Sequence, residues 1–168
     1  MINSAGGFPR FPSRAPALHT RRMRSYEAGT RIQAASDEVW SRLVDVGGWR
    51  DWNSGVDRVE GRVALGEKIT IYATMIRNRP FTVTVTEIRP GEAMRWRGGL
   101  PYGLAVIERT YHLDGQDDGS TLVTVREDHT GPLAGVLDRS TPDLNPSFRQ
   151  FVEGLKALAE GRTSRHTG

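Results

Sequence analysis

The chain has 168 residues, of which 26% are charged and 37% hydrophobic. This length and balance indicate one soluble domain with a substantial hydrophobic core. No apolar run is long enough to span a bilayer, and the absence of Cys excludes disulfides and thiol chemistry. The N-terminus lacks the apolar core of a signal peptide, so we expect a cytoplasmic protein without stable membrane insertion.

The basic charge is concentrated at the two ends of the sequence. Seven of the 23 Lys and Arg residues lie within 1–26 and 162–168, which hold no acidic residue. The other 16 basic residues share the region 27–161 with all 20 acidic ones, so its net charge is about −4. Because nucleic-acid-binding domains usually carry a basic patch on their folded surface, we expect no nucleic-acid partner. A basic tail that touches a membrane or RNA is the alternative for the N-terminal segment.

The domain boundaries follow from composition. Residues 1–23 are rich in Gly, Pro, Ser and Arg without periodicity, which predicts a disordered basic tail. Met23 is an alternative start of translation. We expect one folded domain at residues 24–161 and a second disordered tail at 162–168.

Alternation of apolar and polar residues predicts seven strands, clearest where Thr alternates with apolar residues. The expected strands are 26–34, 56–63, 69–75, 81–86, a strand through Met94 and Trp96, 105–113 and 121–129. Ser36 is the expected N-cap of a short helix that ends at Gly47-Gly48, and Trp49–Asn53 reads as a second helical turn. One or two further turns are expected over 132–139. Short connections between the strands imply antiparallel neighbours.

The last periodic stretch, residues 144–159, predicts an amphipathic α-helix. Its apolar residues are spaced by three and four: Leu144, Phe148, Phe151, Val152, Leu155, Leu158 and Ala159. Pro142 and Pro146 each follow a residue suited to capping, and Gly161 is the expected stop. Because such a helix is unstable alone, the one-faced sheet is expected to curl around it, which gives an α+β fold.

Several segments of the sequence resemble those of a known superfamily. They are 31–40 (RIQAASDEVW), 43–45 (LVD), 49–52 (WRDW), 87–91 (EIRPG) with 94–96 (MRW), 119–121 (GST), 126–131 (REDHTG) and 155–158 (LKAL). Over about residues 24–161 the chain is similar to the START-like superfamily, also called SRPBCC, in its polyketide cyclase/dehydrase and lipid-transport group. The resemblance implies a helix-grip fold, in which a seven-stranded curved antiparallel sheet grips the C-terminal helix around a cavity for an apolar or amphipathic molecule.

Two positions depart from the superfamily pattern. Relatives often have an unbroken helix after the last strand, whereas Pro142 and Pro146 interrupt it here and are expected to keep the cavity mouth open. His129 stands where relatives more usually have an aromatic or apolar residue, which predicts a polar group facing the pocket.

The turn at Asp117-Asp118-Gly119 sets the register of the last hairpin. If Leu113 pairs with Val123, then Arg109 faces Glu127 and Ile107 faces His129, all on the apolar side of the sheet. An inward Arg109–Glu127 pair is costly without good hydrogen bonds, and we expect it to orient the polar end of a ligand, with His129 nearby as a donor or acid–base group. A register shifted by one residue makes the same pair a solvated surface contact.

Apolar side chains supply the rest of the predicted pocket. The candidates are Trp49, Trp52, Met75, Phe81, Trp96, Tyr102, Tyr111, Phe148, Phe151, Val152 and Leu155. Ordinary core packing is the alternative, and we favour it for at least half of the aromatic and Met candidates outside the helix. The loop at 98–103 is either a lid over the cavity or an ordinary hairpin loop.

The sequence contains no pattern typical of a metal or nucleotide site. The four His residues show no HxH or HExxH spacing, and no Walker, GxSxG or dinucleotide-binding pattern is present. We therefore expect no metal and no cofactor. The leading hypothesis is a monomeric or homodimeric binding protein for a small hydrophobic ligand. The first alternative is a cyclase, aromatase or dehydratase that uses His129 or Glu127 to move a proton, and the second is a partner-binding module with an apolar patch at Trp49 and Trp52.

Overall fold

The computed structural model describes residues 24–76 and 79–161. The expected tails at 1–23 and 162–168 lie outside the described residues, as does part of the turn at 77–80. Within the described part, the predicted α+β architecture is confirmed.

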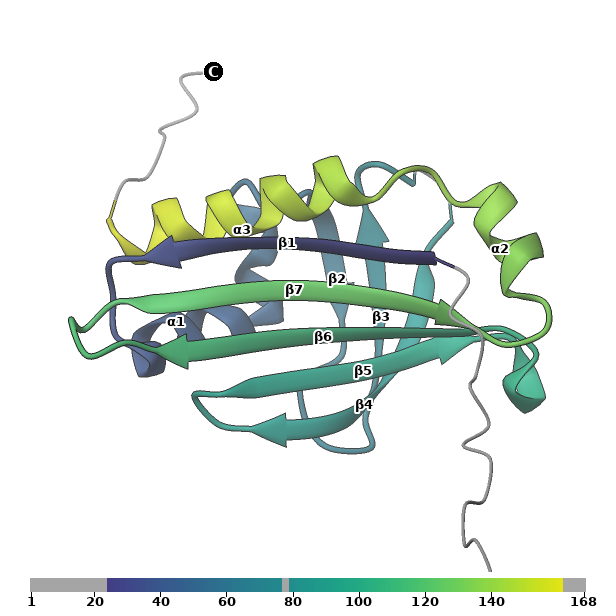
Figure 1. The fold of residues 1–168 in the computed structure, drawn as a ribbon, viewed down its shortest axis with the longest axis horizontal. Coiled ribbons are helices and arrows are strands. Elements are labelled where there is room, and N and C mark those ends of the chain that lie inside the picture. The colour runs from purple at the N-terminus through teal and green to yellow at the C-terminus, as the bar shows by residue number, and fades with distance from the viewer. Residues whose placement is uncertain (1–23, 77–78, 162–168) are drawn as a thin grey trace, which may run out of the picture.

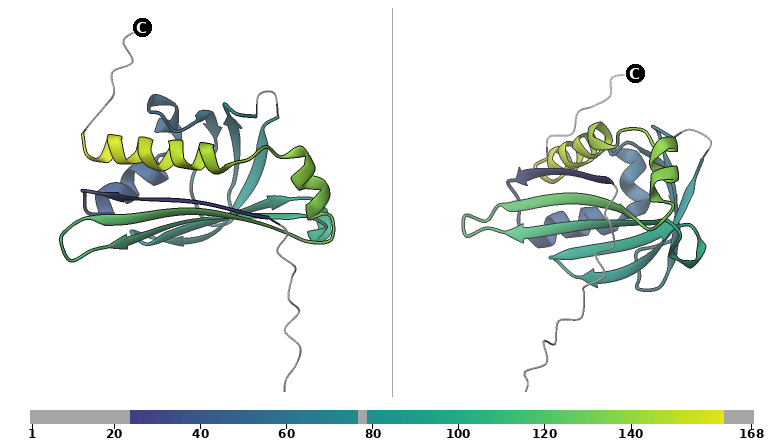
Figure 2. Two further views of the ribbon diagram at one scale, coloured as in Figure 1. Left: turned by 45° about the horizontal axis from the view of Figure 1, so that its top comes forward. Right: turned by 45° about the vertical axis from the view of Figure 1, so that its right-hand side comes forward.

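Seven strands form one antiparallel sheet in the order β1-β7-β6-β5-β4-β3-β2. The strands are β1 (Arg24–Ile32), β2 (Val56–Glu60), β3 (Lys68–Ala73), β4 (Phe81–Arg89), β5 (Ala93–Gly99), β6 (Val106–Gly115) and β7 (Thr121–Thr130). From β2 to β7 each strand pairs with the next one in sequence, and β1 closes the order by pairing with β7. The sheet is strongly curved, and its concave face receives the helices (Figures 1 and 2).

Within residues 24–76 and 79–161, three α-helices and two short 3-10 helices complete the fold. They are α1 (Ser36–Val44), η1 (Val46–Asp51), η2 (Pro101–Gly103), α2 (Ala134–Ser140) and α3 (Asn145–Ala159). The predicted cap at Ser36 is wrong, because Ala35 holds the N-cap position and its carbonyl accepts the N–H groups of Glu38 and Val39. The long helix α3 runs along the sheet beside β1 (Figure 1).

The ends of α3 follow the local sequence. Pro146 lies in the first helical turn, where its missing N–H leaves no intrahelical bond unmade. Gly161 has a φ of +69° and donates its N–H to the Leu158 carbonyl, so it terminates the helix as predicted. The α2–α3 connection, residues 141–144, is the interruption expected from Pro142.

The apolar stripe of α3 packs on aromatic side chains from the sheet and η1. Phe151 lies with its ring centroid 4.8 Å from that of Trp49 and 5.6 Å from that of Tyr111. Tyr111 in turn contacts Trp96 at 5.0 Å, edge to face. This cluster anchors the middle of the helix to the concave face, and edge-to-face contacts of this kind add to the free energy gained from burial.

The middle of α3 also approaches the backbone after η1 very closely. A Cβ atom added to Gly154 would lie 2.4 Å from the Asn53 carbonyl oxygen and 3.0 Å from Cε3 of Trp52. No side chain fits there unless the helix moves away from η1. Gly154 therefore sets the distance between α3 and the backbone that follows η1.

We predict that Gly154→Ala lowers the free energy of unfolding by about 1–3 kcal/mol, because a clash with backbone outweighs the roughly 1 kcal/mol gain in helix propensity. Urea unfolding of the variant measures this change. The exposed neighbour Glu153 provides the control, since Glu153→Gly should cost about 1 kcal/mol through propensity alone. A more stable Gly154→Ala variant would contradict the close approach.

Candidate ligand-binding site

A cavity of about 250 Å³ lies between the concave face of the sheet and α3. Its apolar lining includes Trp49, Ile71, Phe81, Val125, Phe148 and Phe151, and Ala73 closes it at the end of β3. Residues of the β3–β4 connection and of α2 and the start of α3 line it as well, so these segments from distant parts of the sequence meet around one space. The mixture of an apolar body with a few polar groups is typical of small-molecule sites.

Glu127 and Arg109 form a buried ion pair in the cavity wall. The hairpin register predicted from the Asp117–Gly119 turn is confirmed, because Arg109 pairs with Glu127 and Ile107 with His129. The Nε and Nη2 atoms of Arg109 lie 2.7 and 2.6 Å from Oε2 of Glu127. The guanidinium also lies 4.6 Å from the centroid of the Phe148 ring on α3. The pair therefore joins β6, β7 and the first turn of α3.

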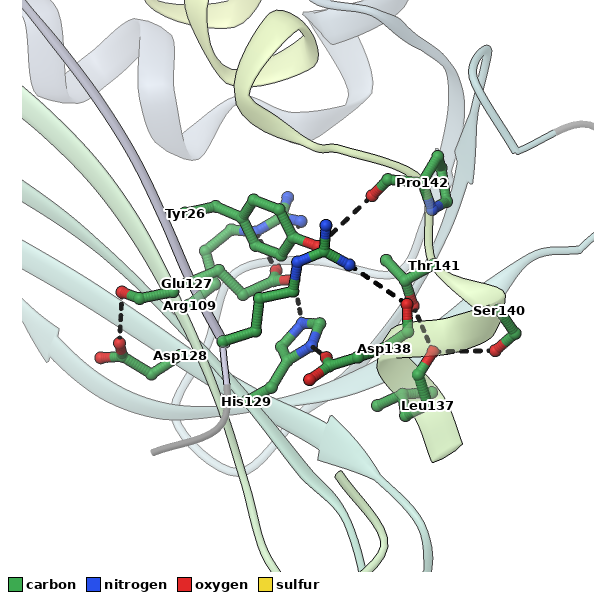
Figure 3. Close-up of polar contacts among 12 residues, drawn as sticks. Tyr26, Arg109, Glu127, Asp128, His129, Leu137, Asp138, Ser140, Thr141 and Pro142 are labelled. Atoms are coloured by element: carbon green, nitrogen blue, oxygen red, sulfur yellow. Dashed lines mark hydrogen bonds and ion pairs between the residues drawn. The ribbon is translucent and has the colours of Figure 1, made fainter. Parts of the chain in front are cut away.

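His129 extends this pair into a chain of charged groups (Figure 3). Its Nε2 lies 2.8 Å from Oε1 of Glu127, and its Nδ1 lies 2.5 Å from Oδ1 of Asp138 on α2. Ionised carboxylates only accept hydrogen bonds, so an imidazole held between two of them donates from both nitrogens and carries a positive charge. Arg109 and His129 then balance Glu127 and Asp138, and the buried cluster is neutral as a whole.

The pKa shifts agree with this arrangement. Burial opposes the charge of His129, yet its hydrogen bonds to Glu127 and Asp138 raise the pKa above the ordinary 6.5. Burial likewise opposes the charge of Glu127, but Arg109 and His129 hold its pKa below the ordinary 4.5. The same balance favours the charged form of Arg109, since Glu127 outweighs desolvation and raises the arginine pKa.

Tyr111 adds a neutral hydroxyl beside the guanidinium. Burial raises the pKa of Tyr111 to about 12, so the phenol stays protonated at neutral pH. Tyr111 lines the cavity as Arg109 does, so a protonated phenol and a guanidinium belong to the same wall. Because Glu127 engages only Nε and Nη2, this part of the wall presents hydrogen-bond donors to the cavity.

Nine of the fourteen residues predicted to line the pocket do line the cavity: Trp49, Met75, Phe81, Arg109, Tyr111, Glu127, His129, Phe148 and Phe151. Three others, Trp96, Val152 and Leu155, are instead buried in the core. Trp52 follows η1, is half-buried and packs against the core. Tyr102 is fully exposed on η2, so of the 98–103 loop only Gly98 and Gly99 reach the cavity. The structure thus divides the predicted set into lining, core and surface.

Sequence reasoning missed Asp138 and the polar groups at the α2–α3 connection. Asp138 contacts His129 only because α2 folds back over the end of β7 (Figure 3). Its one available signal was its place in the short apolar segment that precedes Pro142. Thr141 and Ser147 also line the cavity, and the Tyr26 hydroxyl reaches the Pro142 carbonyl at 3.4 Å.

Comparison with known proteins identifies the family. The profile of the polyketide cyclase/dehydrase and lipid transport family matches residues 23–160. The chain belongs to this family. Its helix-grip architecture is that expected from the sequence resemblance. Among curated proteins, none matches the sequence.

Solved structures of the same fold are similar to this family member over most of its length. A hypothetical protein from Helicobacter pylori has a TM-score of 0.65 at 14% identity, covering 94% of this chain and 99% of the other. The Zhui aromatase/cyclase from a Streptomyces species has a TM-score of 0.62 at 16% identity, with 86% and 98% covered. Norcoclaurine synthase from Thalictrum flavum has a TM-score of 0.61 at 13% identity, with 81% and 93% covered. At these identities the similarity establishes the fold.

Within residues 24–76 and 79–161, no group of three or more His, Cys, Asp or Glu side chains is placed to hold a metal ion. No helix in the same ranges is long and apolar enough to cross a membrane.

The pKa shifts predict a stability maximum in mildly acidic solution. The raised pKa of His129 gives stabilisation that is complete below about 6.5 and is lost as the pH rises through the folded-state pKa. The lowered pKa of Glu127 gives stabilisation that is complete above about 4.5 and is lost as the pH falls. We therefore expect the free energy of unfolding, measured with urea from about pH 4.5 to about pH 9, to decline on the alkaline side of this range.

The matched variant is His129→Gln, which removes the titrating group. It should lose about 3 kcal/mol at pH 6, because both carboxylates lose a buried partner, and its alkaline decline should disappear. An equally steep decline in the variant would show that His129 is not its source.

Proposed function

We propose that this chain binds one small amphipathic molecule in the cavity between the sheet and α3. The observation that carries the proposal is an apolar cavity whose wall contains the neutral chain of Arg109, Glu127, His129 and Asp138. Family membership supports a ligand-binding or cyclase role in general terms. The ligand's apolar body would lie against Phe148 and Phe151, where burial stabilises it by roughly 25 cal/mol per Å² before ordering costs.

Polar recognition comes from the donors beside the ion pair. Arg109 and Tyr111 present N–H and O–H hydrogens, while Glu127 and His129 satisfy each other and hold the guanidinium in place. We infer that the polar end of the ligand is a hydrogen-bond acceptor, such as a carbonyl or a carboxylate. The volume of about 250 Å³ is near the lower end of typical ligand sites, so a compact molecule, or one end of a longer one, fits best.

The second candidate function is a cyclase or dehydratase reaction. It is favoured by the buried, inward placement of Glu127 and His129, which such a reaction requires. However, both nitrogens of His129 are occupied by carboxylates, so neither is available as a base to a molecule in the cavity. The geometry therefore favours orientation of a bound molecule over proton transfer by His129. The partner-binding alternative loses its basis, because Trp49 is buried and Trp52 half-buried.

The cavity assignment can be tested with anilinonaphthalene sulfonate, a fluorescent probe with an apolar body and an anionic end. We expect saturable binding at one site. Ala73→Phe places a ring in the cavity and should weaken probe binding by at least roughly tenfold, since the ring occupies the space that buries the probe. Fluorescence titration gives both affinities.

The neighbouring residue supplies the control. Thr74 is exposed and does not line the cavity, so Thr74→Phe adds the same ring outside it and should leave the affinity unchanged. Circular dichroism would verify that both variants fold. Equal probe binding by the native chain and Ala73→Phe would refute the cavity as the binding site.

A further inference from the structure

One end of the molecule carries an exposed apolar surface that lies outside the cavity. We define the Tyr102 patch as Leu100, Tyr102 and Leu104 from the β5–β6 connection with Leu133 and Val136 from the start of α2; all five are exposed. The Leu133 N–H donates to the Leu104 carbonyl at 2.7 Å, so the two segments lie side by side. Figures 1 and 2 show η2 beside α2 at this end of the sheet.

Tyr102 is the most prominent member of the patch. Its side chain is 100% exposed, while Val136 is 60% exposed. Its backbone has a φ of +58° and a ψ of +20°, a left-handed conformation that a bulky residue rarely adopts. A Gly would occupy this turn without strain. The chain therefore holds an aromatic ring out in solvent at a position where its backbone preference and its burial both favour another residue.

The charges around the patch have one predominant sign. Neither 98–107 nor 130–137 contains a charged residue. Arg97 and Arg139 are exposed at the borders of these segments, whereas Glu108 is ion-paired with Arg95 and Asp138 is held by His129. Arg24 donates to the Asp138 carbonyl, which places the start of β1 beside α2.

The sequence up to the start of β1 is also positively charged. Residues 1–26 contain five Arg and no acidic residue. The region 27–161 has a net charge of about −4, so the cations that border the patch are a local exception to its overall charge.

We propose that the Tyr102 patch docks reversibly on an anionic lipid surface. Exposed Leu and Val side chains around a Tyr suit the boundary between head groups and acyl chains, and flanking Arg side chains suit anionic head groups. A second copy of the chain fits less well, because a two-fold contact would bring Arg97 and Arg139 towards their own symmetry mates. Docking would press α2, which supplies Leu137 and Ser140 to the cavity wall, against the lipid surface.

Vesicle co-sedimentation of the full chain tests this inference. The chain should pellet with phosphatidylcholine vesicles that contain roughly one third phosphatidylglycerol, and only weakly with pure phosphatidylcholine, because each surface cation favours the anionic lipid. Tyr102→Gly relieves the left-handed backbone, so its thermal midpoint should be unchanged or higher, while binding falls by roughly fivefold or more with the loss of the ring.

Two further comparisons make the test specific. Val136→Lys and Val136→Glu disturb the patch equally but differ in charge, so the Glu variant should bind anionic vesicles roughly tenfold more weakly than the Lys variant. Leu65 is 70% exposed in the β2–β3 connection, outside the patch, and Leu65→Ser should bind like the native chain.

Three results would overturn the proposal. The first is no binding of the native chain to anionic vesicles at low salt. The second is an equal loss of binding in Leu65→Ser and Tyr102→Gly. The third is a native dimer, seen by sedimentation velocity, that Tyr102→Gly dissociates, since a second copy would then cover the patch.

Discussion

A carboxylate buried in a protein interior stays ionised only when positive charge and hydrogen bonds replace its water. Glu127 is 3% exposed, and both its oxygens are engaged, one by Arg109 and the other by His129. His129 is 0% exposed and itself requires a second acceptor, which Asp138 supplies. The hydrogen bonds that satisfy Glu127 therefore fix the positions of Arg109, His129 and Asp138. Together these residues join β6, β7 and α2.

The cavity adjoins the same charged groups, since Arg109, Glu127 and His129 all line it. Hydrophobic packing alone would favour a closed core, since the aromatic cluster around Trp49 and Phe151 already fills the middle of the concave face. Beside it, the guanidinium of Arg109 is paired with Glu127 and lies against Phe148, so the first turn of α3 packs on a polar group of the sheet. The break at Pro142 allows α2 to turn away and bring Asp138 over His129. The polar cluster and the open space thus form one unit, which is why we assign ligand orientation to it.

Patterns that depend on neighbouring residues were sufficient to predict the fold and three of the four members of the cluster. Strict alternation predicted the strands, and the Asp117–Gly119 turn fixed a register in which Arg109 meets Glu127. Asp138 could not be found this way, because its contact depends on the path of α2 after the sheet ends. Of two tryptophans three residues apart, Trp49 lines the cavity and Trp52 does not, since the backbone leaves the 3-10 helix for an extended conformation at Trp52. Tyr102 was predicted to line the pocket, and its exposure on η2 was not foreseen because hairpin loops carry no periodic signal that shows their direction.

The free energy of unfolding of two isosteric variants on β7 tests the central role of Glu127 most directly. Glu127→Gln leaves Arg109 and His129 buried without their shared carboxylate, so we expect a loss of about 3–5 kcal/mol at neutral pH. Asp128→Asn removes a charge from the adjacent residue, whose partners Ser25 and Arg126 lie on the solvent side, and should cost less than about 1 kcal/mol. Equal losses in the two variants, or a Glu127→Gln protein as stable as the native chain, would contradict the account.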